Sequence, residues 1–267
     1  MTDLTAAIAA LSTLQEGTEQ GAGQVHLEHP DSDLAVLRLD HPQRRNALSV
    51  AMMVQLAQHV QALSHWPGKV VVLTASPGDV FCSGGDLSQI ADATPEQAKA
   101  MSVAMSAVLD TLLDLPLLSV AAIDGLAVGG GAELVTACDY RVGGPAGGIY
   151  FVHGRLGIAP GWGGAARLVR LVGRRTALRI LTGARPLRMG EAERLGLVDH
   201  RADGPILEAA LAWIAPARRL PVAALSAIKR QVVSAGQGAE VQAAIFGEVW
   251  GAPDHRAALE RLQRHRR

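Results

Sequence analysis

Cysteine, net charge and long apolar runs are what this sequence has little of. Only two of the 267 residues are cysteines, Cys82 and Cys138, which is too few for a small disulfide-stapled secreted scaffold. The sequence therefore predicts two free thiols. The 25 basic residues are balanced by 25 acidic ones, so no broad field favours nucleic acid or an acidic membrane surface. We expect a small-molecule ligand and no nucleic acid.

No apolar run reaches the roughly 20 residues that a transmembrane helix needs. The first 37 residues contain no lysine or arginine, whereas secretory and organellar leaders carry positive charge. We therefore expect a cytoplasmic protein that does not enter a membrane. Histidine partners at metal-ligand spacing, a dinucleotide fingerprint and a Gly-x-Ser-x-Gly elbow are also missing. The sequence predicts neither a metal nor an organic cofactor.

What the sequence does contain is an alternation of strands and helices, followed by helices alone. Hydrophobic residues make up 49% of the chain, enough for one large domain or for one domain with a small appendage. We predict a flexible leader over 1–23, an α/β core with the ligand site over 24–200, and a helical region over 201–267. Within the core the pattern predicts strands at 25–28, 34–39, 69–75, 118–124 and 140–142, and helices at 49–64 and 94–114.

Clusters of two or three glycines follow two of the predicted buried strands. Gly84-Gly85 comes after strand 69–75, and Gly129-Gly130-Gly131 lies between strand 118–124 and a short helix. Each cluster alone could be a plain tight turn. Because the carboxyl ends of parallel strands meet at one edge of a sheet, the two turns together place two bare backbone N–H groups at the same edge. Such donors suit a developing negative oxygen.

Two ionisable residues lie near these turns in the sequence. Glu133 stands among apolar neighbours, so its carboxylate either faces a cavity or caps a helix N-terminus in a salt-bridged setting. His153 follows two apolar residues and is either a functional imidazole or a buried core histidine with satisfied hydrogen bonds. The sequence pattern alone leaves both choices open.

Four motifs in order give the chain a family resemblance over residues 24–265. They are Arg45-Asn46-Ala47-Leu48, Phe81-Cys82-Ser83-Gly84-Gly85-Asp86-Leu87, Gly129-Gly130-Gly131-Ala132-Glu133-Leu134 and Pro160-Gly161-Trp162-Gly163-Gly164. This set resembles the crotonase (enoyl-CoA hydratase/isomerase) superfamily. The resemblance implies an α/β spiral of β-β-α turns, closed by C-terminal helices into a homotrimer or homohexamer.

The resemblance also implies an acyl-CoA thioester as substrate. Its carbonyl oxygen would lie between the N–H groups of Gly85 and Gly130, with Glu133 and His153 as the other catalytic residues. Lys229 would reach the nucleotide phosphates, either within its own subunit or across a subunit boundary. Further contacts along the CoA chain and the acyl group are implied for Arg44, Arg45, Ala47, Ser83, Gly84, Asp86, Leu87 and Trp162.

One position departs from the hydratase pattern. Hydratases place a second glutamate seven residues before the proline of Pro-Gly-x-Gly-Gly, and counting back from Pro160 gives His153. The surrounding segments are similar to a branch of the superfamily that decarboxylates ethylmalonyl- and methylmalonyl-CoA. That chemistry needs no activated water, and an imidazole can donate to a substrate carboxylate where a second glutamate would repel it.

The resemblance thus implies decarboxylation of short 2-carboxyacyl-CoA thioesters through a thioester enolate. Glu133 would either press the carboxylate toward an apolar wall or protonate C2, and His153 could equally be the proton donor. Two other functions stay open at this point. One is hydration, isomerisation or thioester hydrolysis using Glu133 alone, and the other is a non-catalytic CoA-binding subunit.

Overall fold

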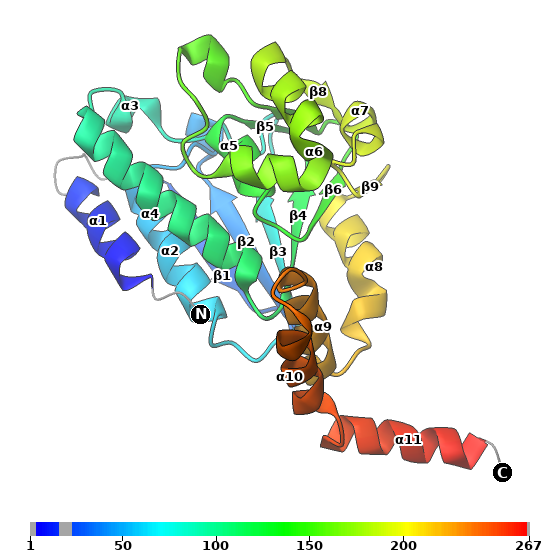
Figure 1. Ribbon diagram of the computed structural model, residues 1–267. Coiled ribbons are helices and arrows are strands. Elements are labelled where there is room, and N and C mark those ends of the chain that lie inside the picture. The colour runs from blue at the N-terminus through cyan, green and yellow to red at the C-terminus, as the bar shows by residue number, and fades with distance from the viewer. Residues whose placement is uncertain (1–3, 16–22, 266–267) are drawn as a thin grey trace.

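A six-stranded sheet organises the chain in the computed structural model, which describes residues 4–15 and 23–265 (Figure 1). The strand order is β1-β2-β3-β4-β6-β9; β1 is antiparallel to β2, and all other neighbours are parallel. The predicted strands are confirmed, and the first two of them form an antiparallel hairpin. The strands are β1 (Gln24–Glu28), β2 (Leu34–Asp40), β3 (Val70–Ala75), β4 (Leu118–Ile123), β6 (Tyr140–Gly143) and β9 (His200–Arg201).

Alternate residues of these strands face two different cores, because side chains in a strand point to opposite faces. Val71 and Leu73 of β3 pack into the larger core. Val70 and Val72 belong to a smaller core, which helix α8 (Ile206–Arg218) covers. Helices α2 (Val50–Leu63), α4 (Pro95–Asp114) and α5 (Gly130–Val135) contribute to the larger core. Burial on both faces explains the unbroken apolar run of β3.

A second, three-stranded sheet was not predicted from the sequence. It consists of β5 (Leu126–Val128), β7 (Gly148–Tyr150) and β8 (Leu187–Arg188). Gly125, at φ 121°, turns the chain from β4 into β5. Strands of two or three residues are too short to show an alternating pattern.

The segment predicted as a leader, residues 1–23, contains a helix in its described part. Helix α1 (Thr5–Gln15) packs on α2 and α4, and Leu4 and Leu11 are fully buried in the larger core. Residues 1–3 and 16–22 lie outside the described part of the chain. The helix forms because docking on two neighbours adds the stability that a short Ala- and Thr-rich segment lacks by itself.

Replacing Leu11 by alanine should therefore destabilise the fold by about 2–5 kcal/mol, as expected for a buried leucine whose cavity cannot close. Urea unfolding would measure the change. Leu262→Ala, at an exposed leucine of the C-terminal helix, is the matched control and should change the free energy of unfolding by less than about 0.5 kcal/mol. Equal stability of the two variants would contradict the docking of α1.

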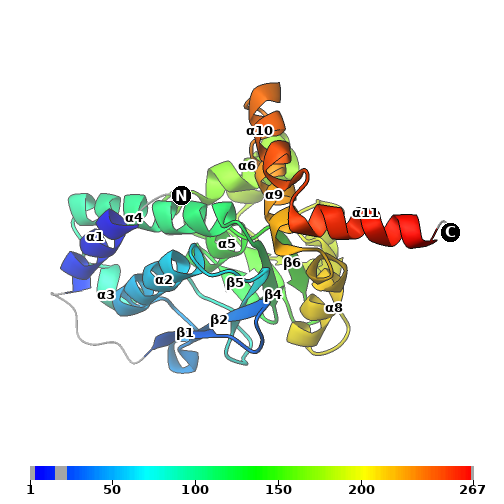
Figure 2. The same cartoon turned by 90° about the horizontal axis from the view of Figure 1, so that it is seen from below.

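The predicted boundary at residue 201 does not coincide with a gap between elements. It cuts β9 and separates α8 from the sheet that this helix covers. Among the described residues, none from the last three helices belongs to either core, and Figure 2 shows α11 pointing away from the rest of the molecule. They are α9 (Val222–Val233), α10 (Ala239–Val249) and α11 (Pro253–His265). The α/β class with a C-terminal helical region is confirmed.

The remaining helices connect these parts. Helix α6 (Gly164–Gly183) breaks at Gly173, where φ is 77°. The others are α3 (Leu87–Ile90), α7 (Met189–Arg194) and the 3-10 turns η1 (Pro42–Arg44) and η2 (His153–Leu156). Within the described ranges, no helix has both the length and the apolar character needed to cross a membrane.

Candidate active site

The two glycine turns lie against each other, as the sequence predicts. A Cβ atom on Gly84 would lie 2.9 Å from the backbone nitrogen of Gly130, and Gly84 has φ 95°. A Cβ atom on Gly131 would lie 2.2 Å from the carbonyl oxygen of Cys82. Only glycine allows this approach of the two backbones.

Two backbone N–H groups at this junction are not used by secondary structure. Leu48 and Gly85 are paired in an isolated β-bridge. Both hydrogen bonds of this bridge involve the neighbours of Gly85: Leu48 donates to the Gly84 carbonyl and accepts from the Asp86 N–H. The bridge therefore does not use the Gly85 N–H. Gly130 is the first residue of α5, and an N–H at this position has no intrahelical partner. Both glycines line one cavity.

This cavity has a volume of about 290 Å³ and a largely apolar wall. Leu87 and Ile158, both more than half exposed, stand among its lining residues. The cavity brings together most of the predicted site: Ser83, Gly84, Gly85, Leu87, Gly130, Glu133, His153 and Trp162. A second cavity, of about 430 Å³, is lined by the chain around 143–147, 188–190 and 201–203 and contains none of the predicted residues.

The Glu133 carboxylate is held by the loop that leads into α6. Its Oε1 accepts from the Gly161 N–H at 3.1 Å, and its Oε2 accepts from the N–H groups of Trp162 and Gly164, each at 2.8 Å. Gly164 begins α6, and a Cβ there would lie 2.4 Å from Cγ of Glu133. Glu133 thus lines the cavity and also caps a helix, so both sequence interpretations hold for the same residue.

His153 faces Glu133 across a short distance. Its Nε2 lies 3.0 Å from Oε1 of Glu133, and both side chains are buried. The other ring nitrogen, Nδ1, is buried and has no hydrogen-bond partner in the part of the chain that the structure describes. His153 lines the cavity, so it is not simply a core histidine with satisfied hydrogen bonds.

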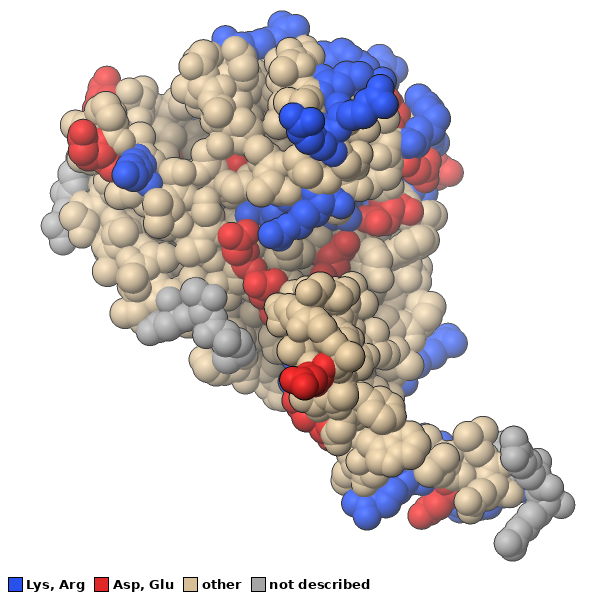
Figure 3. Space-filling view, in the orientation of Figure 1, with Lys and Arg blue, Asp and Glu red and all other residues tan. Residues whose placement is uncertain are grey.

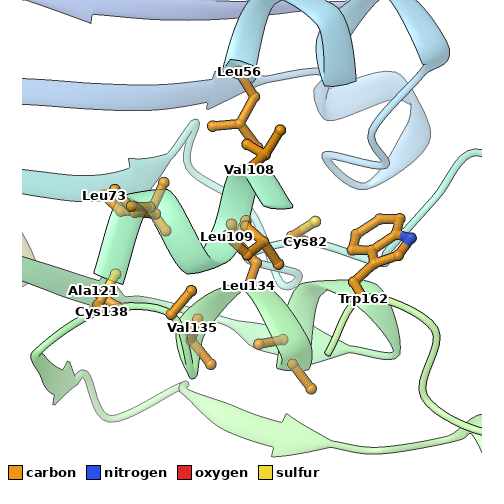
Figure 4. Packing of buried hydrophobic residues seen from close by; sticks show 14 of the residues in the cluster. Leu56, Leu73, Cys82, Val108, Leu109, Ala121, Leu134, Val135, Cys138 and Trp162 are labelled. Atoms are coloured by element: carbon orange, nitrogen blue, oxygen red, sulfur yellow. The ribbon is translucent and has the colours of Figure 1, made fainter. Parts of the chain in front are cut away.

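Trp162 forms the wall above the Gly130 turn. Cβ atoms built on Gly130 and Gly85 would lie 2.3 Å from its Cζ3 and 3.5 Å from its Cζ2, respectively. Figure 4 shows the indole ring on the same side of the core as Cys82. The Arg167 guanidinium fixes this position by donating to the Trp162 carbonyl and by pairing with Asp110 at 2.7 Å.

Both cysteines are free, as predicted, and both are buried. Burial raises the pKa of each thiol, Cys82 and Cys138, to about 12. A thiol with this pKa is almost entirely protonated at neutral pH, and the thiolate is the reactive form. Cys82 therefore contributes packing and a backbone carbonyl beside the cavity, and no nucleophile.

Four predicted contact residues lie beside the cavity without lining it. Asp86 caps α3 by accepting from the Ser88 N–H at 3.0 Å, and Ala47 is buried. Arg44 and Arg45 are exposed, and their carbonyls accept from the Ser83 hydroxyl and the Ser83 N–H. These residues brace the loop around Gly84.

The structure corrects the prediction for Lys229. Its side chain is buried, and Nζ donates to Oδ2 of Asp139 at 2.7 Å and to the Leu117 carbonyl at 2.8 Å. Removing a partner from such a buried pair costs several kcal/mol, so this ammonium group is held inside the protein. Lys229 of α9 thus forms a buried structural ion pair with Asp139, and it does not line the cavity.

Sequence reasoning missed the contribution of α4. Met101 and Ser102 line the cavity, and the Ser102 hydroxyl donates to the Gly161 carbonyl. Nothing in the sequence marks them, because the face of α4 that meets this loop is set by tertiary packing.

No group of three or more histidine, cysteine, aspartate or glutamate side chains suited to a metal ion occurs among residues 4–15 and 23–265.

Comparison with known proteins agrees with this geometry. The family model described as Enoyl-CoA hydratase/isomerase matches residues 30–248. Proteins named ethylmalonyl-CoA decarboxylase are 41% identical in Danio rerio and 38% identical in Gallus gallus, each covering 91% of this chain and 85% of the relative. The crystal structure of an enoyl-CoA hydratase from Bacillus anthracis superposes with a TM-score of 0.84 at 25% identity, over 90% of this chain and 96% of that one.

Proposed function

The chain belongs to the enoyl-CoA hydratase/isomerase family, and on that premise we propose that it decarboxylates short 2-carboxyacyl-CoA thioesters such as ethylmalonyl-CoA and methylmalonyl-CoA. The observation behind this proposal is the pair formed by His153 and Glu133 at the cavity wall, with Nε2 and Oε1 3.0 Å apart. An imidazole stands where a hydratase of this family has its second glutamate. The names of the relatives support the same reaction.

The N–H groups of Gly85 and Gly130 supply the main stabilisation in this proposal. Loss of CO₂ breaks the bond between C2 and the carboxylate, and the electron pair moves into a thioester enolate. Its oxygen becomes negative during the step, where two fixed donors stabilise it most; one such donor is worth about 2.7–4 kcal/mol. We therefore assign these two glycines to an oxyanion hole.

The cavity wall suits a substrate that must lose its charge. Leu87, Ile90, Met101, Leu156 and Ile158 surround the glutamate–histidine pair with apolar surface. A carboxylate in such surroundings is poorly hydrated, whereas the CO₂ that forms is neutral, so the environment favours the product side.

The reaction needs no redox partner, and we propose no metal or organic cofactor; CoA is part of the substrate. Unchanged turnover after treatment with a chelator would support this.

Product analysis tests the reaction directly. The purified protein is mixed separately with ethylmalonyl-, methylmalonyl- and crotonyl-CoA, and the products are identified by mass spectrometry. We expect butyryl-CoA and propionyl-CoA from the first two. Conversion of crotonyl-CoA alone would replace the proposal with hydration. Binding of all three thioesters without turnover would identify a non-catalytic CoA-binding subunit.

We also propose that the chain assembles as a homotrimer or homohexamer through its C-terminal helices. Ile228, Val232, Phe246 and Trp250 are each more than half exposed on α9, α10 and the following residue. Figure 3 shows the surface over α10 as mostly uncharged. Large apolar side chains on one projecting element are typical of an interface.

Light scattering at micromolar concentration should give a mass of three or six chains. Changing Phe246 and Trp250 together to glutamate should lower that mass, because charges would be buried at the contact. A wild-type protein that is strictly monomeric would contradict the proposed assembly.

The two free buried thiols suit a reducing compartment, and we retain a cytoplasmic location as part of the proposal.

A further inference from the structure

The hydrogen bonds of Glu133 determine which chemical tasks this residue can perform. Both carboxylate oxygens accept from backbone amides, one from Gly161 and one from Trp162 and Gly164. A protonated carboxyl accepts only weakly at its hydroxyl oxygen, so N–H groups that donate to both oxygens favour the ionised form. The position at the N-terminus of α6 favours the same anionic form.

The anchor of this carboxylate is rigid. A Cβ on Gly164 would lie 2.7 Å from Oε2, so the helix end and the carboxylate are in direct contact. Ser102 holds the Gly161 carbonyl from α4, and Arg167 holds the Trp162 carbonyl from α6. A carboxylate fixed in this way can orient a neighbour precisely, but its oxygens are already occupied by protein donors.

The neighbour that it orients is His153. Nε2 lies 3.0 Å from Oε1. An unprotonated Nε2 at this distance would set its lone pair against the carboxylate, so the distance favours the tautomer with a proton on Nε2. That leaves Nδ1 as the variable nitrogen. It is buried and has no partner among the described residues, on a ring that lines the cavity.

We propose that Glu133 is a positioning residue that acts through His153, and that Nδ1 of His153 delivers the proton to C2. This assignment rests on the proposed decarboxylation. The bond between C2 and the carboxylate breaks, the electron pair of that bond enters the enolate, and CO₂ leaves. C2 then takes the proton from Nδ1 of the imidazolium, which becomes neutral with its remaining proton on Nε2. Solvent water restores the proton to Nδ1. The Glu133 anion stabilises the imidazolium before the transfer.

The first test reads the protons of His153 without any substrate. Long-range ¹H–¹⁵N spectra of protein with ¹⁵N-labelled histidine distinguish a ring protonated at Nε2, at Nδ1 or at both, and the His153 signals are those lost in His153→Gln. A proton on Nε2, alone or together with one on Nδ1, upholds the assignment. A ring protonated only at Nδ1 overturns it.

The second test is Glu133→Gln. We expect the glutamine to keep its carbonyl oxygen on the Trp162 and Gly164 amides and to turn its NH₂ group toward His153. The ring must then accept at Nε2, which moves its single proton to Nδ1. We expect kcat to fall by about 10²–10⁴-fold, the range for a lost general acid or a wrong histidine tautomer, with a much smaller change in KM.

Glu208→Gln, at an exposed glutamate in the first turn of α8, is the matched control and should leave both the spectrum and kcat unchanged. A Glu133→Gln protein that folds and retains either the Nε2 proton or the wild-type kcat overturns the assignment. If this variant does not fold, the wild-type spectrum alone decides. Wild-type protein with a proton on Nε2 but no CO₂ release would uphold the Glu133–His153 geometry and overturn the proposed function instead.

Discussion

Proline in place of Gly130 is expected to lower the decarboxylation rate by about a hundredfold or more. The substitution deletes the N–H that we assign to the enolate oxygen, and losing one oxyanion donor typically costs about 10²–10³ in kcat. The first position of a helix tolerates proline, so α5 should still form. Turnover of ethylmalonyl-CoA at saturating substrate is the measurement.

Gly130→Ala is the necessary control, because both substitutions add a Cβ atom. That atom would lie 2.3 Å from Cζ3 of Trp162 in the wild-type geometry, so the indole must shift in either variant. Alanine keeps the N–H, so the ratio of the two rates removes the effect of the Cβ atom and leaves that of the lost donor together with the proline ring. Equal turnover of the two folded variants would remove Gly130 from the oxyanion hole.

Local patterns were sufficient for the parts of the fold that repeat. The apolar run of β3 predicts a strand buried on both faces, and the cap at Thr94 with Pro95 predicts the start of α4. The glycine turns could be placed together because parallel strands end at one edge. Each of these predictions uses only neighbouring residues and one rule about parallel sheets.

The errors arise where the outcome depends on packing between distant segments. The sequence of α1 has only a weak preference for helix, and packing on α2 and α4 stabilises it. The sequence of α8 does not show that this helix covers the smaller core. Lys229 and Asp139 are 90 residues apart in the sequence, so no local pattern predicts their buried ion pair. The amides that hold Glu133 come from a loop 28 to 31 residues later, and only the folded chain shows that its carboxylate is already occupied.

Alanine in place of His153 should abolish most decarboxylation while leaving the fold intact. The substrate carboxylate would then enter a cavity that contains the Glu133 anion and lacks an imidazole donor, and leaving a buried charge without a partner costs several kcal/mol. Glu133 keeps its three backbone donors, so we expect only a small change in melting temperature. His65→Ala, at an exposed histidine, is the control.

Rate and melting temperature must be measured on the same His153→Ala preparation, because the two roles of this residue predict opposite results. A core histidine would show a lower melting temperature with a normal rate per folded molecule. Stable protein with normal CO₂ release would therefore remove His153 from the reaction.

Glutamate at position 153 separates decarboxylation from hydration more sharply than alanine does. His153→Glu places a second carboxylate beside Glu133, so a substrate carboxylate would face two negative charges and decarboxylation should fall below the rate of His153→Ala. The same change restores the pair of carboxylates that hydratases of this family use to hold a water molecule. Crotonyl-CoA lacks the 2-carboxylate and is not repelled, so we expect slow hydration of this substrate to appear in His153→Glu. Faster decarboxylation by His153→Glu than by His153→Ala would show that repulsion at this wall does not limit the reaction, and the reason for an imidazole at this position would have to be sought elsewhere.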